Sequence, residues 1–188
     1  MTTSIELPTV NPSTLETFRQ FCNDGYCRHD ITQPWTANGY LYATDARTIV
    51  RTRCDAILER EREGRVPNAK SIFCPAIGEH FDASKCIHDW PEHPGFTVPM
   101  EWECDFCDGY QGFKSCWACY GKGFIVFARP AHIRIGTQLI NGTFAKRIES
   151  LGNVKWYEFT RESIGFLSAG IDGRDDIEGV VMKIKEED

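Results

Sequence analysis

Apolar residues at helical spacing mark two stretches of the chain. The first follows a capping-box sequence, Ser13-Thr-Leu-Glu16, and predicts a helix of about ten residues that ends near Gly25. The second has Thr137 or Asn141 as its N-cap and ends before Gly152, a residue suited to the C′ position. The two stripes consist of Leu15, Phe18, Phe21 and Cys22, and of Ile140, Phe144, Ile148 and Leu151.

Alternating or continuous apolar runs predict strands along much of the remaining chain. Residues 40–43 and 48–54 flank a turn-like run at 44–47, which is typical of a β-hairpin. Residues 55–65 mix charges of both signs and predict an exposed helix whose side chains form ion pairs with one another. The other predicted strands span residues 5–7, 124–128, 133–135, 154–159, 163–168 and 177–184.

The order strand, helix, strands recurs at the two ends of the chain. This repeat predicts an α+β fold of two strand-helix-strand half-units, with helices on one face of antiparallel sheet. We place the half-units at residues 1–65 and 125–188. Between them lie an irregular connection at 66–99, rich in proline, and an inserted hairpin at 100–124.

Composition narrows the class of protein. The sequence has 188 residues, a net charge of −6 and nine cysteines, with no secretory signal and no apolar run of transmembrane length. An odd number of cysteines, partly in C-x-x-C pairs, is typical of reduced thiols and metal ligands, so we expect a cytoplasmic protein away from membranes. The negative charge argues against coating nucleic acid by bulk electrostatics.

Two C-x-x-C pairs are the strongest chemical signal in the sequence. Cys104-Asp-Phe-Cys107 and Cys116-Trp-Ala-Cys119 are separated by residues 108–115, a segment long enough to fold back as a hairpin. Four thiolates would then converge on one tetrahedral Zn²⁺ that keeps no open position, so the ion is structural. Two redox pairs are the alternative, but a thioredoxin-like motif belongs in a βαβ setting that this sequence does not show.

The residues around these cysteines resemble the cysteine-rich zinc finger of DnaJ-type co-chaperones. Cys116-Trp-Ala-Cys119-Tyr-Gly121-Lys-Gly123 matches its C-x-x-C-x-G-x-G repeat, whereas Gln111 replaces the second glycine of the other repeat. Glycine suits turns that need positive φ close to sulfur. Two repeats instead of the family's four imply one zinc ion. His93-Pro94 is followed by Gly95 and not by the aspartate of the J-domain signature.

A second metal site is the weaker expectation. Cysteine and histidine in the connection are suitable zinc ligands, but their spacing matches no standard knuckle, and ordinary loop histidines and buried thiols explain them as well. The residues concerned are Cys74, His80, Cys86 and His88, with His93 nearby.

Two segments also resemble a DNA sliding-clamp domain. The run Tyr40-Leu-Tyr42-Ala-Thr-Asp-Ala46-Arg47 is similar to the clamp hairpin, with Ala46 in place of the usual glycine, and residues 140–154 and 179–184 are similar to its helix and closing strand. The resemblance implies that helices face DNA, with Arg19, Lys146 and Arg147 as their cations. Ring clamps use several such domains, so enclosing a duplex would require a homo-oligomer.

No phosphate loop, nucleophile elbow or open metal site is present, so we expect a binding protein and not an enzyme. The sequence leaves two partners open: DNA with its replication or repair machinery, and another protein bound by a chaperone-like adaptor. Residues 51 and 53 share one strand face, which suits phosphate binding or an ordinary solvated surface. The DNA-contact candidates are Arg19, Arg47, Arg51, Arg53, Lys146 and Arg147. The protein-contact candidates, which could instead pack the hairpin onto the body, are Trp102, Phe106, Tyr110, Phe113, Trp117 and Tyr120.

Overall fold

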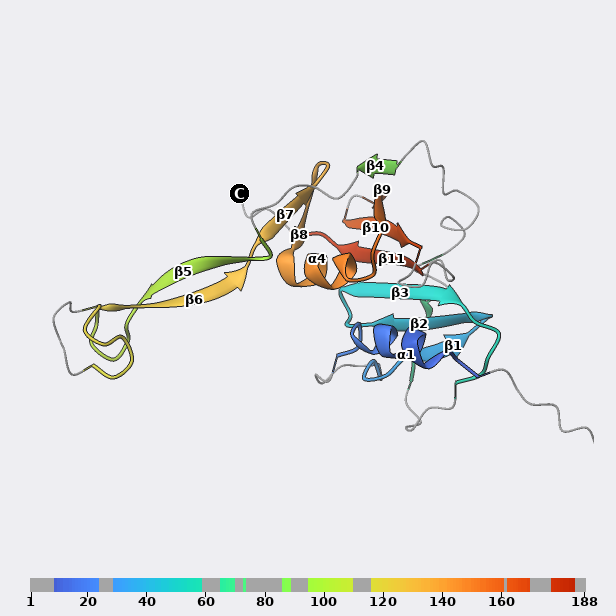
Figure 1. The fold of residues 1–188 in the computed structure, drawn as a ribbon, viewed down its shortest axis with the longest axis horizontal. Coiled ribbons are helices and arrows are strands. Elements are labelled where there is room, and N and C mark those ends of the chain that lie inside the picture. Colours follow the sequence, from blue (N-terminus) through green and yellow to red (C-terminus); the bar gives the residue numbers. More distant parts are fainter. Residues whose placement is uncertain are drawn as a thin grey trace, which may run out of the picture.

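Seven antiparallel strands form the main sheet of the computed structural model (Figure 1). The structure describes residues 9–23, 29–58, 65–69, 73, 86–88, 95–109, 116–160, 162–169 and 177–184. The strand order is β1-β2-β3-β11-β10-β9-β4. The strands are β1 (Trp35–Ala37), β2 (Tyr40–Thr44), β3 (Thr48–Arg53), β4 (Cys86–His88), β9 (Val154–Thr160), β10 (Ser163–Ser168) and β11 (Ile177–Met182).

Two helices and two separate β-ribbons complete the described elements. The helices are α1 (Pro12–Arg19) and α4 (Gly142–Glu149), and neither they nor any other described helix is long and apolar enough to cross a membrane. One ribbon pairs β7 (His132–Ile135) with β8 (Gln138–Asn141) beside the sheet. The other pairs β5 (Thr97–Glu103) with β6 (Phe124–Pro130) and projects away from the body (Figure 1).

Both helices pack against the same face of the sheet. Phe18 of α1 and Ile148 of α4 are fully buried in one core with strand residues such as Val50 and Phe166. Asn11 caps α1 by accepting a hydrogen bond from the N–H of Ser13 at 3.0 Å, with Pro12 at the first helical position. The main core therefore lies between the sheet and its two short helices.

The opposite face of the sheet buries a charge. Arg51 is 8% exposed and donates two hydrogen bonds, of 2.7 and 2.9 Å, to the Glu178 carboxylate, which lies opposite it where β3 pairs with β11. Its guanidinium carbon lies 4.5 Å from the ring centroid of Tyr40 and 4.3 Å from that of Phe73. Phe73, which belongs to the predicted connection, thus covers the Arg51 guanidinium on this face. Glu178 balances its charge and accepts its hydrogen bonds.

The predicted α+β arrangement of two strand-helix-strand, clamp-like half-units is wrong. The fold is mostly antiparallel sheet with two helices of eight residues each among the described residues, and the strands from both ends of the chain join in one sheet through β3 and β11. Apolar spacing predicts which face of an element is buried, but it does not determine how many strands share a sheet.

Several local predictions are confirmed and others are corrected. The hairpin of β2 and β3 forms, β9 and β10 begin where predicted, Asn141 is the N-cap of α4, and Gly152 has a positive φ of 72°. Residues 133–135 lie in β7, which pairs with β8, and the N-cap of α1 is Asn11 and not Ser13. Residues 55–58 are not helical, whereas 59–64 and the strand predicted at 5–7 lie outside the described residues.

Replacing Arg51 tests its role in joining the two ends of the chain. We expect Arg51→Ala to lower the free energy of unfolding by about 2–3 kcal/mol, because Glu178 loses its partner and two rings lose their packing. Arg53→Ala, an exposed position on the same strand, should change stability by less than about 0.5 kcal/mol. Urea unfolding measures the free energy of unfolding of both variants, and an equal loss of stability in the two would contradict the role assigned to Arg51.

Candidate metal centre on a projecting ribbon

The β5–β6 ribbon carries the four cysteines at its far end. Its strands pair from Thr97 opposite Pro130 to Glu103 opposite Phe124, and the cysteine loops follow directly. At the near end, the N–H of Ala131 donates to the carbonyl of Phe96 at 2.8 Å, and Val98 packs against the main core. The ribbon is therefore anchored in the body at one end and held by the cysteine loops at the other.

Each C-x-x-C pair lies in a tight turn held by a backbone hydrogen bond. The N–H of Cys107 donates to the carbonyl of Cys104 at 3.1 Å, and the N–H of Tyr120 donates to the carbonyl of Cys116 at 2.8 Å. Positive φ follows in both turns, at Asp108 and Gly109 in the first and at Tyr120 and Gly121 in the second. The expected left-handed turns after the knuckles are confirmed, and at Gly109 a side chain would also collide with Glu103.

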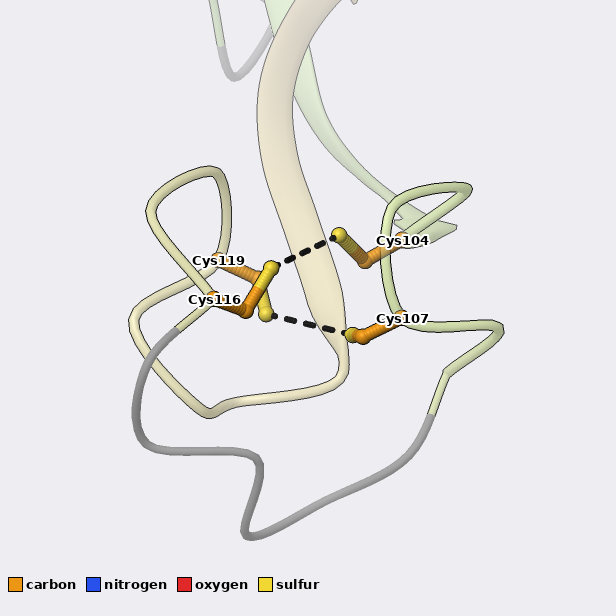
Figure 2. A group of neighbouring side chains, drawn as sticks. All are labelled: Cys104, Cys107, Cys116 and Cys119. Carbon is orange, nitrogen blue, oxygen red and sulfur yellow. Dashed lines mark hydrogen bonds between the residues drawn. The ribbon is translucent and has the colours of Figure 1, made fainter.

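The four sulfur atoms converge between the two turns (Figure 2). The Sγ atoms of Cys104 and Cys116 are 3.7 Å apart, those of Cys107 and Cys119 are 3.6 Å apart, and all four lie within 4.8 Å of one another. Metal–sulfur bonds of about 2.3 Å in a tetrahedron give sulfur–sulfur edges of about 3.8 Å, whereas a disulfide needs about 2.05 Å. The spacing fits one tetrahedral metal ion and no disulfide.

The pKa values of the thiols show why a cation belongs here. Burial raises the pKa of Cys104, and burial together with the neighbouring thiols raises the pKa of Cys107 to about 12. Burial also acts to raise the pKa of Cys119, but hydrogen bonds to Gly123, the neighbouring thiols and Gly121 outweigh it and lower that pKa to about 6. One thiolate is thus accommodated, and further ones need a positive charge among them.

Among the residues that the structure describes, this is the one group of cysteine, histidine and carboxylate side chains at metal-binding distance. Three of its members are at most 3% exposed, and Cys107 is half-buried. For the second candidate site, only the backbones of Cys86 and His88 are described, on β4 at the edge of the sheet. Cys74, His80 and His93 lie outside the described residues.

The predicted DNA-contact cations do not gather on one face. Arg51 is buried on the side of the sheet opposite the helices. Arg147 of α4 pairs with the Asp45 carboxylate at 2.6 Å, and Arg19 of α1 pairs with Glu16 at 3.4 Å. Exposed cations complete the set: Arg47 in the β2–β3 turn, Arg53 at the end of β3 and Lys146 on α4.

The predicted protein-contact aromatics are exposed instead of packed on the body. The exposed fractions are 54% for Trp102, 62% for Phe106, 69% for Trp117 and 82% for Tyr120. The rings of Phe106 and Trp117, one from each knuckle, lie 4.6 Å apart between centroids at an angle of 58°. Tyr110 and Phe113 lie outside the described residues.

Sequence reasoning missed the apolar side chains of the ribbon itself. Val126 is 53% exposed and Phe127 is 43% exposed, on adjacent positions of β6. The sequence of β5 contains a pattern that could have indicated this apolar surface. Val98, Met100 and Trp102 alternate with other residues, so their side chains share one face of the strand.

Loss of one sulfur should abolish metal binding while the body stays folded. We expect Cys116→Ser to reduce the metal content from about one ion per chain to a small fraction, because three thiolates no longer close the tetrahedron. Cys54→Ser, a half-buried cysteine outside the cluster, should keep its metal. Elemental analysis and far-ultraviolet circular dichroism measure the two effects, and a Cys116→Ser protein with full metal content would refute the ligand assignment.

Metal affinity should rise with pH. The bound cysteines must be thiolates, while the raised pKa values of Cys104 and Cys107 keep both protonated at neutral pH without metal. Binding therefore releases protons, and below neutral pH we expect the apparent affinity to fall about tenfold per pH unit for each proton released. Competition against a chromophoric chelator over a pH series measures this, and an affinity independent of pH would contradict a thiolate site.

Comparison with protein-family models, with curated proteins and with solved structures gives no match to this chain. The likeness to the DnaJ-type zinc finger therefore rests on the quoted repeat alone, and no match supports a likeness to sliding clamps. The four-cysteine site stands on its own geometry, as a cluster able to bind one metal ion.

Proposed function

We propose that the chain is a binding protein whose β5–β6 ribbon, held at its end by a structural zinc ion, presents knuckle aromatics to another protein. The carrying observation is the distribution of exposed apolar side chains. Of the eight large hydrophobic side chains exposed among the described residues, three lie on the knuckles, namely Phe106, Trp117 and Tyr120, and three more lie on the ribbon that carries the knuckles, namely Trp102, Val126 and Phe127. Large aromatics held out in water in this way are typical of interaction surfaces.

Zinc is the metal that best suits the site. Four thiolates in a tetrahedron favour Zn²⁺ among the common divalent ions, and a closed Cys₄ set leaves no position for a reacting water. The ion would supply structural bonds only. By fixing both knuckles it would hold Phe106 against Trp117, so a partner meets a surface that is already ordered.

Charge around the knuckles favours a protein partner over nucleic acid. Among the described residues, Glu101, Glu103, Asp105 and Asp108 are exposed on the ribbon and its first knuckle, against Lys122 beside the second knuckle and Arg129 at the body end of the ribbon. A zinc ion bound by four thiolates adds two further negative charges. Such a surface repels phosphates and attracts apolar segments flanked by lysine or arginine.

The body adds support for this choice. Two of its candidate DNA-contact cations, Arg51 and Arg147, are engaged with Glu178 and Asp45. The exposed side chains of the helices include Glu16 and Glu149 as well as Arg19 and Lys146, so negative and positive charges balance on the surface of the helices. DNA binding remains the competing prediction, and the experiment below includes it.

A titration of defined probes tests the proposal. Fluorescence anisotropy would follow four labelled probes: a peptide of leucine and lysine, the same peptide with glutamate for lysine, single-stranded DNA and duplex DNA. We expect the lysine peptide to bind, the glutamate peptide to bind far more weakly, and Trp117→Ala to weaken binding by about tenfold or more. Ile57→Ala, which removes a 77% exposed apolar side chain of the body, should have no effect.

Three outcomes would overturn the proposal. These are DNA binding with a steep salt dependence and no peptide binding, equal binding of both peptides, or equal losses in Trp117→Ala and Ile57→Ala. The first outcome would restore the prediction of a DNA-binding protein.

A further inference from the structure

The register of the β5–β6 ribbon gives it one apolar face. Residues directly opposite in an antiparallel pair point to the same side of the sheet. The pairs Val98–Arg129, Met100–Phe127 and Trp102–Ile125 therefore share a face on which arginine is the only polar residue. Glu101 and Glu103 lie on the other face, opposite Val126 and Phe124.

The middle of this face is uncovered. Val98 packs against the main core at one end, and Ile125 packs against the cysteine cluster at the other. Between these ends Phe127 is 43% exposed, and Trp102, directly opposite Ile125, is 54% exposed. A two-stranded ribbon with one solvated apolar face is marginal by itself and is stabilised when that face is packed.

We propose that this face is covered by the same face of a second copy of the chain, with the two ribbons packed antiparallel about a two-fold axis near Met100 and Phe127. A two-fold interface requires a patch that complements itself, and an apolar stripe does so. Pro99, within β5, has no N–H to offer an added strand, so strand addition at the β5 edge is disfavoured relative to packing through the face.

Charge selects the antiparallel orientation. The knuckle end carries Asp105, Asp108 and the thiolate cluster, while the body end of the same face carries the exposed Arg129. A parallel arrangement would bring two acidic ends together. An antiparallel one brings Arg129 of each copy toward the acidic end of the other, and keeps the two bodies at opposite ends of the pair.

This surface is distinct from the knuckle aromatics of the proposed function. The dimer uses Met100, Trp102 and Phe127 of the ribbon, whereas peptide binding uses Phe106, Trp117 and Tyr120 of the knuckles. Trp117→Ala should therefore leave the dimer intact, so the two proposals can fail independently.

Light scattering on the metal-loaded chain over a range of concentrations tests the dimer. We expect a mass of twice the chain mass, and a dissociation constant about tenfold higher or more in Phe127→Ser. The matched control is Val126→Ser, which removes an apolar side chain that is 53% exposed on the opposite face of the same strand and should keep the dimer. Arg129→Glu should weaken the dimer more at low salt than at high salt.

Metal content and circular dichroism verify that each variant is folded. A monomeric wild-type chain at every concentration would overturn the inference. So would a dimer that Phe127→Ser leaves unchanged, or one that Val126→Ser weakens as much as Phe127→Ser does.

Discussion

The far end of the β5–β6 ribbon depends on four sulfur atoms because its described residues form no other core. The buried residues there are Cys104, Cys116 and Cys119, with Ile125 and Ala118 beside them. Apolar burial of this size cannot order two loops against their conformational entropy. A metal ion bound by the four thiolates would supply that order, so the aromatic side chains of the knuckles would not be needed inside. This accounts for a cluster of rings that remains in water.

The body obtains its stability in a different way. Its sheet is packed on both faces, by the helices on one side and by Phe73 and Ala69 of the connection on the other. The pairing of β3 with β11 joins the two ends of the chain, and Arg51 with Glu178 lies at that junction. Since the body and the ribbon end are stabilised by separate means, metal loss can disorder the knuckles without unfolding the sheet. The body then serves as the support from which the ribbon extends.

The sequence predicted what is local and missed what is distant. The cysteine knuckles, the β2–β3 hairpin and the Asn141 cap depend on neighbouring residues, so spacing alone identified them. The ion pair of Arg51 joins residues 127 positions apart, and no local pattern indicates that a strand arginine will be buried. The clamp-like arrangement failed for the same reason, because several single elements were predicted correctly but their assembly into one sheet is a long-range property. The exposure of Phe127 likewise depends on where the ribbon projects.

The negative charge of the metal site constrains both proposed contacts of the ribbon. A divalent ion bound by four thiolates would leave two negative charges, and Asp105 and Asp108 are further negative charges on the outside. A partner at the knuckles must therefore bring apolar surface or positive charge, and a second copy can approach only with its own knuckles turned away. The thiolates that would order the loops thus also give the knuckles a negative charge. That charge limits which partners the knuckles can bind and in which orientation two ribbons can pair. Specificity here comes from repulsion as much as from attraction.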